Sequence, residues 1–467
     1  MLELNRLQKL TGFGRAHGSL GYLYRPTHVE QINEIFALAR QNGLSIGLRG
    51  AGRSYGDAAL NSGQIVLDMQ RMNRILAWNP ETGIIRIEPG VTIQQLWQYT
   101  IEDGWWPAVV PGTMAPTIGG CLAMNVHGKN NYRAGTFGDH VLEFTALLSN
   151  GESGTVTPGE NADLFYSMIG SLGVLGVFTS ITLQLKRIYS GNLSVEAWAP
   201  RDLAQQINDL EARKDTDDYI VSWIDGLANS TALGRGQIHA ANYLDPGVDP
   251  APQQTLRLEH QTLPDTLMGV VPSSILWRLM SPWMNNPGTR LINAGKYYAS
   301  RLGDHKTIRQ PHAAFHFLLD YIPNWIQSYG PQGLIQYQSI IPTENAAAAF
   351  SEMLRLTHKR GLPSYLVVLK RHRPDDFLLS HAVDGYSLAF DFKVTRNNRA
   401  GLQRMASELN QIVLAANGRF YFAKDSTLTL GDTAQFLGAE TLAKFKVLKS
   451  CYDPQNLLQS DLYKRVF

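Results

Sequence analysis

The chain has 467 residues, of which 44% are hydrophobic and 18% are charged, the balance of a folded protein with a large core. This length exceeds one compact domain and predicts two or three. The formal net charge is only +2, so no strong electrostatic field attracts nucleic acid and we expect no nucleic-acid partner. The two cysteines, Cys121 and Cys451, cannot form a disulfide framework. The opening segment MLELNRLQKL lacks the pattern of a secretory signal, so we expect a cytoplasmic protein and leave peripheral membrane contact open.

Helix and strand signals alternate along the first 190 residues. Thr27 and Glu30 form a predicted capping box before an apolar stripe that ends at Gly43. Thr92 and Gln95 form a second box that opens another helix. Strands are predicted at residues 44–48, 64–69 and 84–88.

The uncharged stretch 164–185 is long enough to cross a membrane as a helix. Its glycines, Gly170, Gly173 and Gly176, and the strand-like alternation of its second half favour another structure. We predict a buried helical turn, a glycine loop and a strand, and keep a membrane span as the alternative.

The pattern changes after about residue 195. Helices are predicted at 202–213, at 344–360 and from 402 onward, strands at 334–341 and 386–393, and a surface loop at 244–265. Segment 268–286 is apolar but interrupted by prolines. It could contact lipid, or it could pack in the core or cover a pocket. We favour core or pocket lid, because prolines prevent a long amphipathic helix.

The densest chemical signal is the segment RGAGRSYGD at 49–57, directly after a predicted strand. Its glycines allow the backbone to direct several N–H groups at a phosphate. Only DAALNSG separates Gly56 from the next predicted strand, which is too short for the crossover helix of a Rossmann fold. Three further glycine-dense segments occur at 110–114, 117–121 and 125–129. Any one of the four could be an ordinary turn, but together they indicate backbone lying along an extended ligand.

The segments RGAGRSYGD, PGTMAPTIGGCLAMNVHGKN, AGTFGDHV and GSLGVLGVFTSITL resemble the PCMH-type FAD-binding domain of the vanillyl-alcohol oxidase family. The segments SYGPQGLIQYQSIIPTE, GRFYFAKDS and DPQNLLQSDL are similar to its decaprenylphosphoryl-ribose 2′-oxidase branch. The resemblance implies an α+β chain of two domains. These are an FAD-binding domain at 1–192 and an antiparallel-sheet substrate domain at 193–415, with a C-terminal segment at 416–467 that returns to the first.

The resemblance also implies an elongated FAD with its pyrophosphate on the first glycine loop. Many relatives attach the flavin to a histidine in that loop, where this chain has Arg53, Ser54 and Tyr55. We therefore expect non-covalent FAD, with His127 as the remaining candidate for a covalent link. The implied cofactor contacts are Gly50, Ala51, Gly52, Arg53, Ser54, Tyr55, Gly56, Pro111, Gly112, Thr113, Thr117, Gly119, Gly120, Cys121, Asn125, Gly128, Ala134, Gly135, Gly173, Gly176 and Val177.

Oxidation of a secondary alcohol removes a proton from oxygen and a hydride from carbon, and the flavin accepts the hydride at N5. A buried cation beside the flavin favours that transfer, and the resemblance assigns this role to Lys424. His127 could orient the substrate or accept its proton, or it could be a structural histidine. Gln336 and Gln338 alternate on a predicted strand and share one face. That face points either at the sugar hydroxyls or at solvent.

Further substrate contacts rest on the resemblance alone: Lys129, Trp223, Lys370, Ser387 and His316. Three positions depart from the branch. Ala389 stands where relatives have a cysteine near the flavin, Ser387 where they have an asparagine, and His316 where they have a pocket tyrosine. We therefore expect a pocket of similar plan with an altered lining, which inhibitors that trap the cysteine thiol should not modify.

These features predict an FAD-dependent oxidoreductase that acts on a sugar or a polyprenyl-phosphate-linked sugar. The role implied is glycan or cell-wall precursor synthesis, with a separate NAD-dependent ketoreductase completing an epimerisation. The alternative is an aldonolactone or alditol oxidase that passes electrons to oxygen. A flavin-carrying protein without catalysis is less favoured, because Lys424 and His127 suit a reaction. Spacings typical of metal sites, such as Cys-x-x-Cys, do not occur, so no metal is expected.

Overall fold

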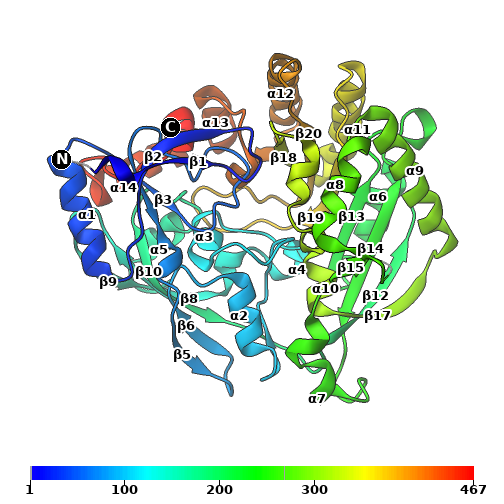
Figure 1. Ribbon diagram of the computed structural model, residues 1–467, viewed down its shortest axis with the longest axis horizontal. Coiled ribbons are helices and arrows are strands. Elements are labelled where there is room, and N and C mark those ends of the chain that lie inside the picture. The colour runs from blue at the N-terminus through cyan, green and yellow to red at the C-terminus, as the bar shows by residue number, and fades with distance from the viewer. Residues whose placement is uncertain (1–2, 268) are drawn as a thin grey trace.

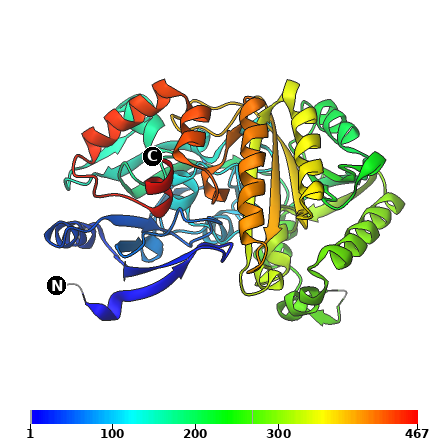
Figure 2. The ribbon, with the colours of Figure 1, turned by 90° about the horizontal axis from the view of Figure 1, so that it is seen from above.

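The computed structural model describes residues 3–267 and 269–467. Met268, the first residue of the apolar segment 268–286, lies outside this range. The chain is an α+β protein built on three larger sheets, of four, five and eight strands. The first two sheets are formed by the first 190 residues, and the eight-stranded sheet lies beside them (Figures 1 and 2).

The four-stranded sheet carries the first glycine loop. In spatial order its strands are β1 (Leu7–Thr11), β2 (Gly18–Tyr24), β4 (Ile65–Asp68) and β3 (Ile46–Arg49). Helix α1 (Val29–Gln41) packs on it through Ile32 and Phe36. The helix was predicted from its stripe, but the capping box was wrong. His28 is the N-cap, and the backbone N–H of Thr27 donates instead to the side chain of Gln31 at 2.8 Å.

The five-stranded sheet is entirely antiparallel. Its strands are β5 (Ile75–Asn79), β6 (Ile84–Ile87), β10 (Val177–Gln184), β8 (Val141–Leu147) and β9 (Ser153–Val156). The second capping box is confirmed, because Thr92 accepts from the N–H of Gln95 at 3.1 Å and opens α2 (Ile93–Thr100). Stretch 164–185 also folds as predicted, from α5 (Ala162–Met168) through a glycine loop into β10. Among the described residues, no helix is long and apolar enough to cross a membrane.

The eight-stranded sheet is antiparallel throughout. Its strands are β17 (Lys306–Pro311), β12 (Asn192–Trp198), β14 (Gly236–Tyr243), β13 (Tyr219–Ile224), β19 (Leu366–His372), β20 (Gly385–Lys393), β18 (Leu334–Pro342) and β21 (Arg419–Phe420). The principal helices beside it are α6 (Leu203–Arg213), α9 (Asn286–Leu302), α11 (Thr343–Lys359) and α12 (Arg399–Ala415). Helices α11 and α12 pack side by side against β18 (Figure 2). The predicted helices at 202–213 and 344–360 and both predicted strands are therefore confirmed.

Shorter elements connect these sheets. They are β7 (Trp105–Trp106), α3 (Ile118–Ala123), α4 (Asn131–Ala134), β11 (Lys186–Arg187), α7 (Pro252–Thr255), β15 (Thr266–Leu267), β16 (Val271–Pro272), α8 (Leu276–Met280) and α10 (His312–His316). The predicted loop 244–265 includes α7 and a 3-10 turn at Leu258–Gln261, in which Gln261 is buried and donates to the carbonyl of Gly191. The sequence reading missed these turns because they are held by tertiary contacts.

The C-terminal segment connects both halves of the molecule. After β21 it forms a 3-10 turn (Phe422–Lys424) and helices α13 (Leu430–Leu437), α14 (Ala439–Tyr452) and α15 (Asp461–Val466). Between α14 and α15, residues 457–459 run beside β3, where the N–H of Ile46 donates to the carbonyl of Leu457 at 2.7 Å. Arg465 binds Asp57, just after the glycine loop, and also Asp425, just after Lys424. This segment thus ties the glycine loop to Lys424.

Candidate active site

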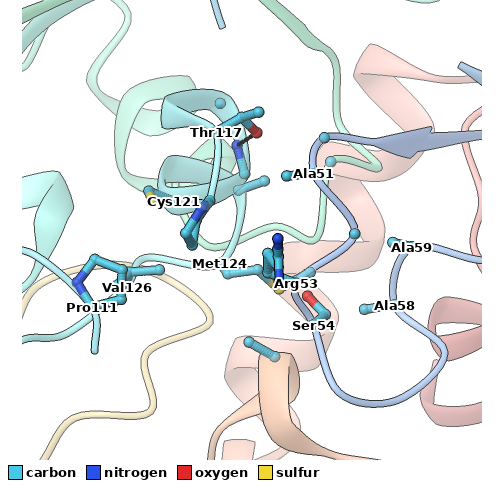
Figure 3. Close-up of a pocket in the computed structure, with 18 of the residues that line it drawn as sticks. Ala51, Arg53, Ser54, Ala58, Ala59, Pro111, Thr117, Cys121, Met124 and Val126 are labelled. Carbon is cyan, nitrogen blue, oxygen red and sulfur yellow. Dashed lines mark hydrogen bonds between the residues drawn. The ribbon is translucent and has the colours of Figure 1, made fainter. Parts of the chain in front are cut away.

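A large cavity opens between the glycine loops and the eight-stranded sheet. It encloses about 1280 Å³ of empty space, counted together with its open mouth. Figure 3 shows Ala51, Arg53 and Ser54 of the first glycine loop near α3, which carries Cys121. The glycine-rich walls suit an extended dinucleotide.

The first glycine loop presents free backbone donors to this cavity. The N–H of Phe13 donates to Ser54, and the N–H of Tyr55 donates to Ala423, so both sides of the loop are fixed. Within the described chain, no hydrogen bond occupies the N–H groups of Ala51, Gly52 or Arg53, all of which line the cavity. Gly52 has φ +63°, a turn that glycine adopts without strain. Unpaired amides in a turn form an anion-binding concavity, so the loop fits a pyrophosphate.

The second wall is held in place from the eight-stranded side. Asp320 accepts from the Thr113 hydroxyl at 2.7 Å and from the Met114 N–H at 2.8 Å. Burial raises the pKa of Asp320. Leu319, its neighbour, lines the cavity and donates its N–H to Gly112. The segment at 318–321 therefore closes one side of the cavity by direct contacts with the loop at 111–114.

Strand register places several predicted substrate contacts on one face of the eight-stranded sheet. Residues directly opposite each other on neighbouring strands point to the same face. The register pairs are Trp223 with Val368, Lys370 with Ser387, Gln338 with Ala389, and Gln336 with Asp391. Because these strands are neighbours, one face of the sheet carries the five predicted substrate contacts on these strands: Trp223, Lys370, Ser387, Gln338 and Gln336.

Lys424 and Lys370 bring two amino groups to one end of the cavity. Both line it, and among residues 3–267 and 269–467 neither makes an ion pair. Burial lowers the pKa of Lys424 to about 8, although nearby Asp391 opposes the shift. Burial and the neighbouring Lys424 and Lys129 hold the pKa of Lys370 well below its usual value. Burial also raises the pKa of Asp391 to about 6. Within the described residues, Asp391 forms no ion pair with either lysine.

His127 lines the same end of the cavity in a fully packed environment. The Gln338 side-chain amide lies 2.9 Å from its Nε2, while its Nδ1 has no partner in the described structure. The rings of His372, His381 and Tyr421 surround it, with centroids 4.7, 5.4 and 5.1 Å away. Burial, followed by the charges of Lys370, His372, His381 and Lys424, holds the pKa of His127 well below its usual value. The imidazole is therefore neutral, so one of its two ring nitrogens keeps a free lone pair.

Most of the predicted cofactor contacts line the cavity. These are Gly50, Ala51, Gly52, Arg53, Ser54, Tyr55, Pro111, Gly112, Thr113, Thr117, Gly119, Gly120, Cys121, Gly173 and Val177. Six others do not: Gly56, Asn125, Gly128, Ala134, Gly135 and Gly176. Two of these have a visible structural task. A Cβ on Gly56 would lie 1.9 Å from the Asp425 carbonyl, and Asn125 accepts from the N–H of Gly138 at 2.9 Å.

The predicted substrate contacts mostly lie behind the cavity wall. Only Lys370 lines it. Gln336 donates to Asp391 at 2.5 Å, so the alternative of a solvent-facing strand edge does not apply. Ser387 lies 2.8 Å from Nε2 of His372. Trp223 lies under the ammonium of Lys296 at 4.1 Å.

Lys129 and His316 lie deeper still. Lys129 donates to the carbonyl of Phe315, and burial lowers its pKa to about 7. His316 packs against Trp106 and Tyr219, with ring centroids 5.4 and 4.7 Å away. Both are buried, so in this conformation neither reaches the cavity.

Sequence reasoning missed four groups at the site: His372, His381, Tyr421 and Asp391. Tyr421 lines the cavity, and the two histidines pack on His127. His372 follows Lys370 by two residues on one strand, so alternation along β19 could have revealed it. Nothing in the sequence near His381 indicates its place. No group of three or more His, Cys, Asp or Glu within the described ranges could hold a metal ion.

Comparison with known proteins agrees with this geometry. A family model described as an FAD binding domain matches residues 21–157. The chain is 28% identical to decaprenylphosphoryl-beta-D-ribose oxidase of Mycolicibacterium smegmatis over 98% of this chain and 97% of that protein. It is 29% identical to L-gulonolactone oxidase of Bos taurus over 38% of this chain and 40% of that protein. It is 27% identical to a putative D-arabinono-1,4-lactone oxidase of Neurospora crassa, over 37% and 31% of the two chains.

Proposed function

Because this chain is an FAD-linked oxidoreductase with an FAD-binding domain, we propose that it oxidises a secondary hydroxyl of a sugar. One observation carries the proposal. A neutral histidine, His127, meets Lys424 and Lys370 at one end of a cavity whose other walls are glycine loops, and neither lysine forms an ion pair with the residues that the structure describes. That grouping supplies a proton acceptor and a positive field at one point.

The residues present fit the cofactor. The free amides of Ala51, Gly52 and Arg53 would hold the pyrophosphate, and the loops at 111–113 and 117–121 would flank the rest of the molecule. When bound, FAD supplies the acceptor for the hydride. We propose that it is bound non-covalently, since the first glycine loop offers no histidine and Nε2 of His127 faces Gln338.

His127 would take the hydroxyl proton at Nδ1. The structure places the Gln338 side-chain nitrogen 2.9 Å from Nε2, and the Gln338 side-chain oxygen is buried without a partner among the described residues. Rotation of this amide by 180° would bring the oxygen to Nε2, where it would accept the Nε2 proton. In that rotated orientation Gln338 would set the tautomer that leaves the Nδ1 lone pair free. Lys424 would stabilise the negative charge that develops as the proton leaves, because a cation in a dry site acts strongly on nearby charge.

For the substrate, we propose a sugar hydroxyl in a polyprenyl-phosphate-linked pentose, with a separate NAD-dependent ketoreductase acting on the product. The support is similarity over nearly the full length of both chains to a decaprenylphosphoryl-beta-D-ribose oxidase. The second candidate is a free aldonolactone or alditol, supported by the partial matches to two lactone oxidases. The departures at Ala389, Ser387 and His316 favour neither, since none of the three lines the cavity.

We also propose two domains, close to 1–192 and 193–415, with the segment that follows returning to the first. Each has its own sheets and shares none with the other. Because Arg419–Phe420 pair with β18, the returning segment is better counted from after Phe420.

Anaerobic mixing tests the proposal directly. Purified protein with its flavin is mixed with lipid-linked pentoses, free sugars and lactones while the flavin absorbance is followed. We expect bleaching by one sugar class, and loss of about 10²–10³-fold in kcat for Lys424→Met without loss of flavin. Lys446→Met, an exposed lysine on α14, is the matched control. Absence of bleaching by every alcohol, or an unchanged kcat in Lys424→Met, would contradict the assignment.

A further inference from the structure

Exposed apolar side chains are concentrated on one short part of the molecule. Helix α8, the 3-10 turn at Ser281–Trp283 and helix α9 carry large hydrophobic residues that face solvent. Leu302 is 92% exposed, Leu291 65%, Tyr298 59% and Leu279 55%. We call this surface the α8–α9 face. Clustered exposure of this kind marks an interaction surface, whereas single exposed apolar residues are ordinary.

Helix α9 has its apolar stripe on the side away from the protein. Leu291, Tyr298 and Leu302 follow the spacing i, i+7, i+11, which 3.6 residues per turn brings within about 40° of one another. The buried residues Asn293 and Tyr297 lie on the opposite side. A surface helix of a globular protein normally has the reverse arrangement, with the apolar stripe toward the core. The outer stripe is therefore positioned to meet an apolar phase outside the protein.

The charge around this stripe has one sign. From residue 266 to residue 303 the sequence has four basic residues, Arg278, Arg290, Lys296 and Arg301, and no Asp or Glu. Arg278, Arg290 and Arg301 are exposed, whereas the ammonium of Lys296 lies over the ring of Trp223 at 4.1 Å. None of the four makes an ion pair with the described part of the chain. On the α9 cylinder, Arg290 and Arg301 project from the same flank of the stripe. Long basic side chains beside an apolar stripe can extend to anionic headgroups while their stems stay in apolar surroundings.

The α8–α9 face adjoins the cavity through an apolar cluster. Met284 is buried with Tyr55, Tyr329 and Leu334, and Met280 packs against the same cluster. Tyr55 lines the cavity. Lys393 donates to the carbonyl of Met284 at 2.7 Å, which fixes this region to β20. Figure 1 places α9 at the outer edge of the eight-stranded sheet, away from β5 and β9.

We propose that the α8–α9 face docks on the surface of an anionic lipid bilayer. The exposed leucines and Tyr298 would enter the boundary between headgroups and acyl chains, and Arg278, Arg290 and Arg301 would lie among the headgroups. A second copy of this chain is a poorer occupant, because a symmetric contact would place Arg290 and Arg301 near their own images. The inference does not depend on the substrate, and its test measures no activity.

The test is flotation of the full-length flavoprotein with phosphatidylcholine vesicles that contain either no anionic lipid or about one third phosphatidylglycerol. We expect binding to the anionic vesicles, weaker binding to the neutral ones, and loss of binding at high salt, which screens exposed charges. Leu291→Asn with Leu302→Asn should weaken binding at least about tenfold. Arg290→Gln should weaken it about fivefold.

Val447→Asn with Leu430→Asn is the matched control. Val447 is 68% exposed and lies on α14, and Leu430 is 52% exposed and lies on α13. Retained flavin absorbance in every variant would show that each remains folded. The proposal is overturned if the wild-type chain binds neither vesicle, or if the Leu291 and Leu302 changes weaken binding no more than the control. A dimer in light scattering that dissociates with those changes, without vesicle binding, would assign the face to a second copy.

Discussion

Replacement of Arg465 by methionine should loosen the cofactor without removing any cavity-lining residue. Arg465 contacts Asp57 through two nitrogens, at 2.9 and 2.8 Å, and Asp425 at 2.9 Å. Asp57 follows the first glycine loop and Asp425 follows Lys424. The methionine retains most of the apolar stem but leaves two carboxylates close together without their cation.

The expected magnitude follows from burial. Removing one partner of a buried ion pair costs about 3–5 kcal/mol, whereas exposed pairs are worth at most about 1 kcal/mol. The Arg465 side chain is 27% exposed, and those of Asp57 and Asp425 are 13% and 5% exposed. We therefore expect a loss of about 2–4 kcal/mol in the stability of the flavin-bound state, the buried value reduced for partial screening. Arg465→Met with Asp57→Asn should be less destabilising than the sum of the two changes, because they remove the same contact.

The assay is a urea titration in which flavin fluorescence reports cofactor release and tryptophan fluorescence reports unfolding. Arg360→Met is the control, since Arg360 pairs with Glu408 at the surface, where the two side chains are 48% and 37% exposed. The control should shift either midpoint by less than the equivalent of about 1 kcal/mol. If Arg465→Met released flavin at the same urea concentration as this control, Arg465 would not fix the glycine loop to the Lys424 segment.

Three further predictions concern the cavity. Burial lowers the pKa of Lys424 to about 8, so the lysine loses its charge, and kcat should fall, as the pH rises through about 8. Arginine keeps its charge at this pH. The pH profile of Lys424→Arg should therefore show this fall at higher pH or not at all. Gly56→Ala should lower both the flavin occupancy and the stability of the protein, because the new Cβ would lie 1.9 Å from the Asp425 carbonyl. The control is Gly154→Ala, which should change neither, because the space around Gly154 is open. Equal flavin occupancy in the two purified variants would argue against the contact at Gly56. Acid precipitation should release all of the flavin to the supernatant if it is bound non-covalently, and yellow colour retained in the pellet would identify a covalent link.

Local patterns in the sequence were sufficient for much of the fold. The Thr92–Gln95 box involves residues three apart, and its hydrogen bonds form within one helical turn, so it could be predicted. The prediction of a capping box at Thr27 was wrong, although it too rested on neighbouring residues. Gln31 competes with Glu30 for the first turn, and the sequence alone does not determine which side chain folds back.

The candidate site was predictable only in part, because its pieces come from distant segments. The glycine loop and Lys424 were identified from their motifs, and both line the cavity. The packing of His381 on His127 joins residues that no local periodicity connects. Lys129 was expected at the substrate, yet its ammonium is held by the carbonyl of Phe315, a contact fixed by the tertiary fold. Sequence spacing locates a chemical group on its element, but depth relative to the cavity follows from how the sheets meet.

The contact between Asp57 and Arg465 spans 408 residues of sequence, which has a consequence for biosynthesis. Chains are made from the amino terminus, and their early parts fold first. The glycine loop is therefore complete long before the ribosome has translated its partner. A nascent polypeptide that stops before α15 would carry every motif for the dinucleotide and still lack the residue that secures it. We expect stable loading with the prosthetic group to follow translation of this helix.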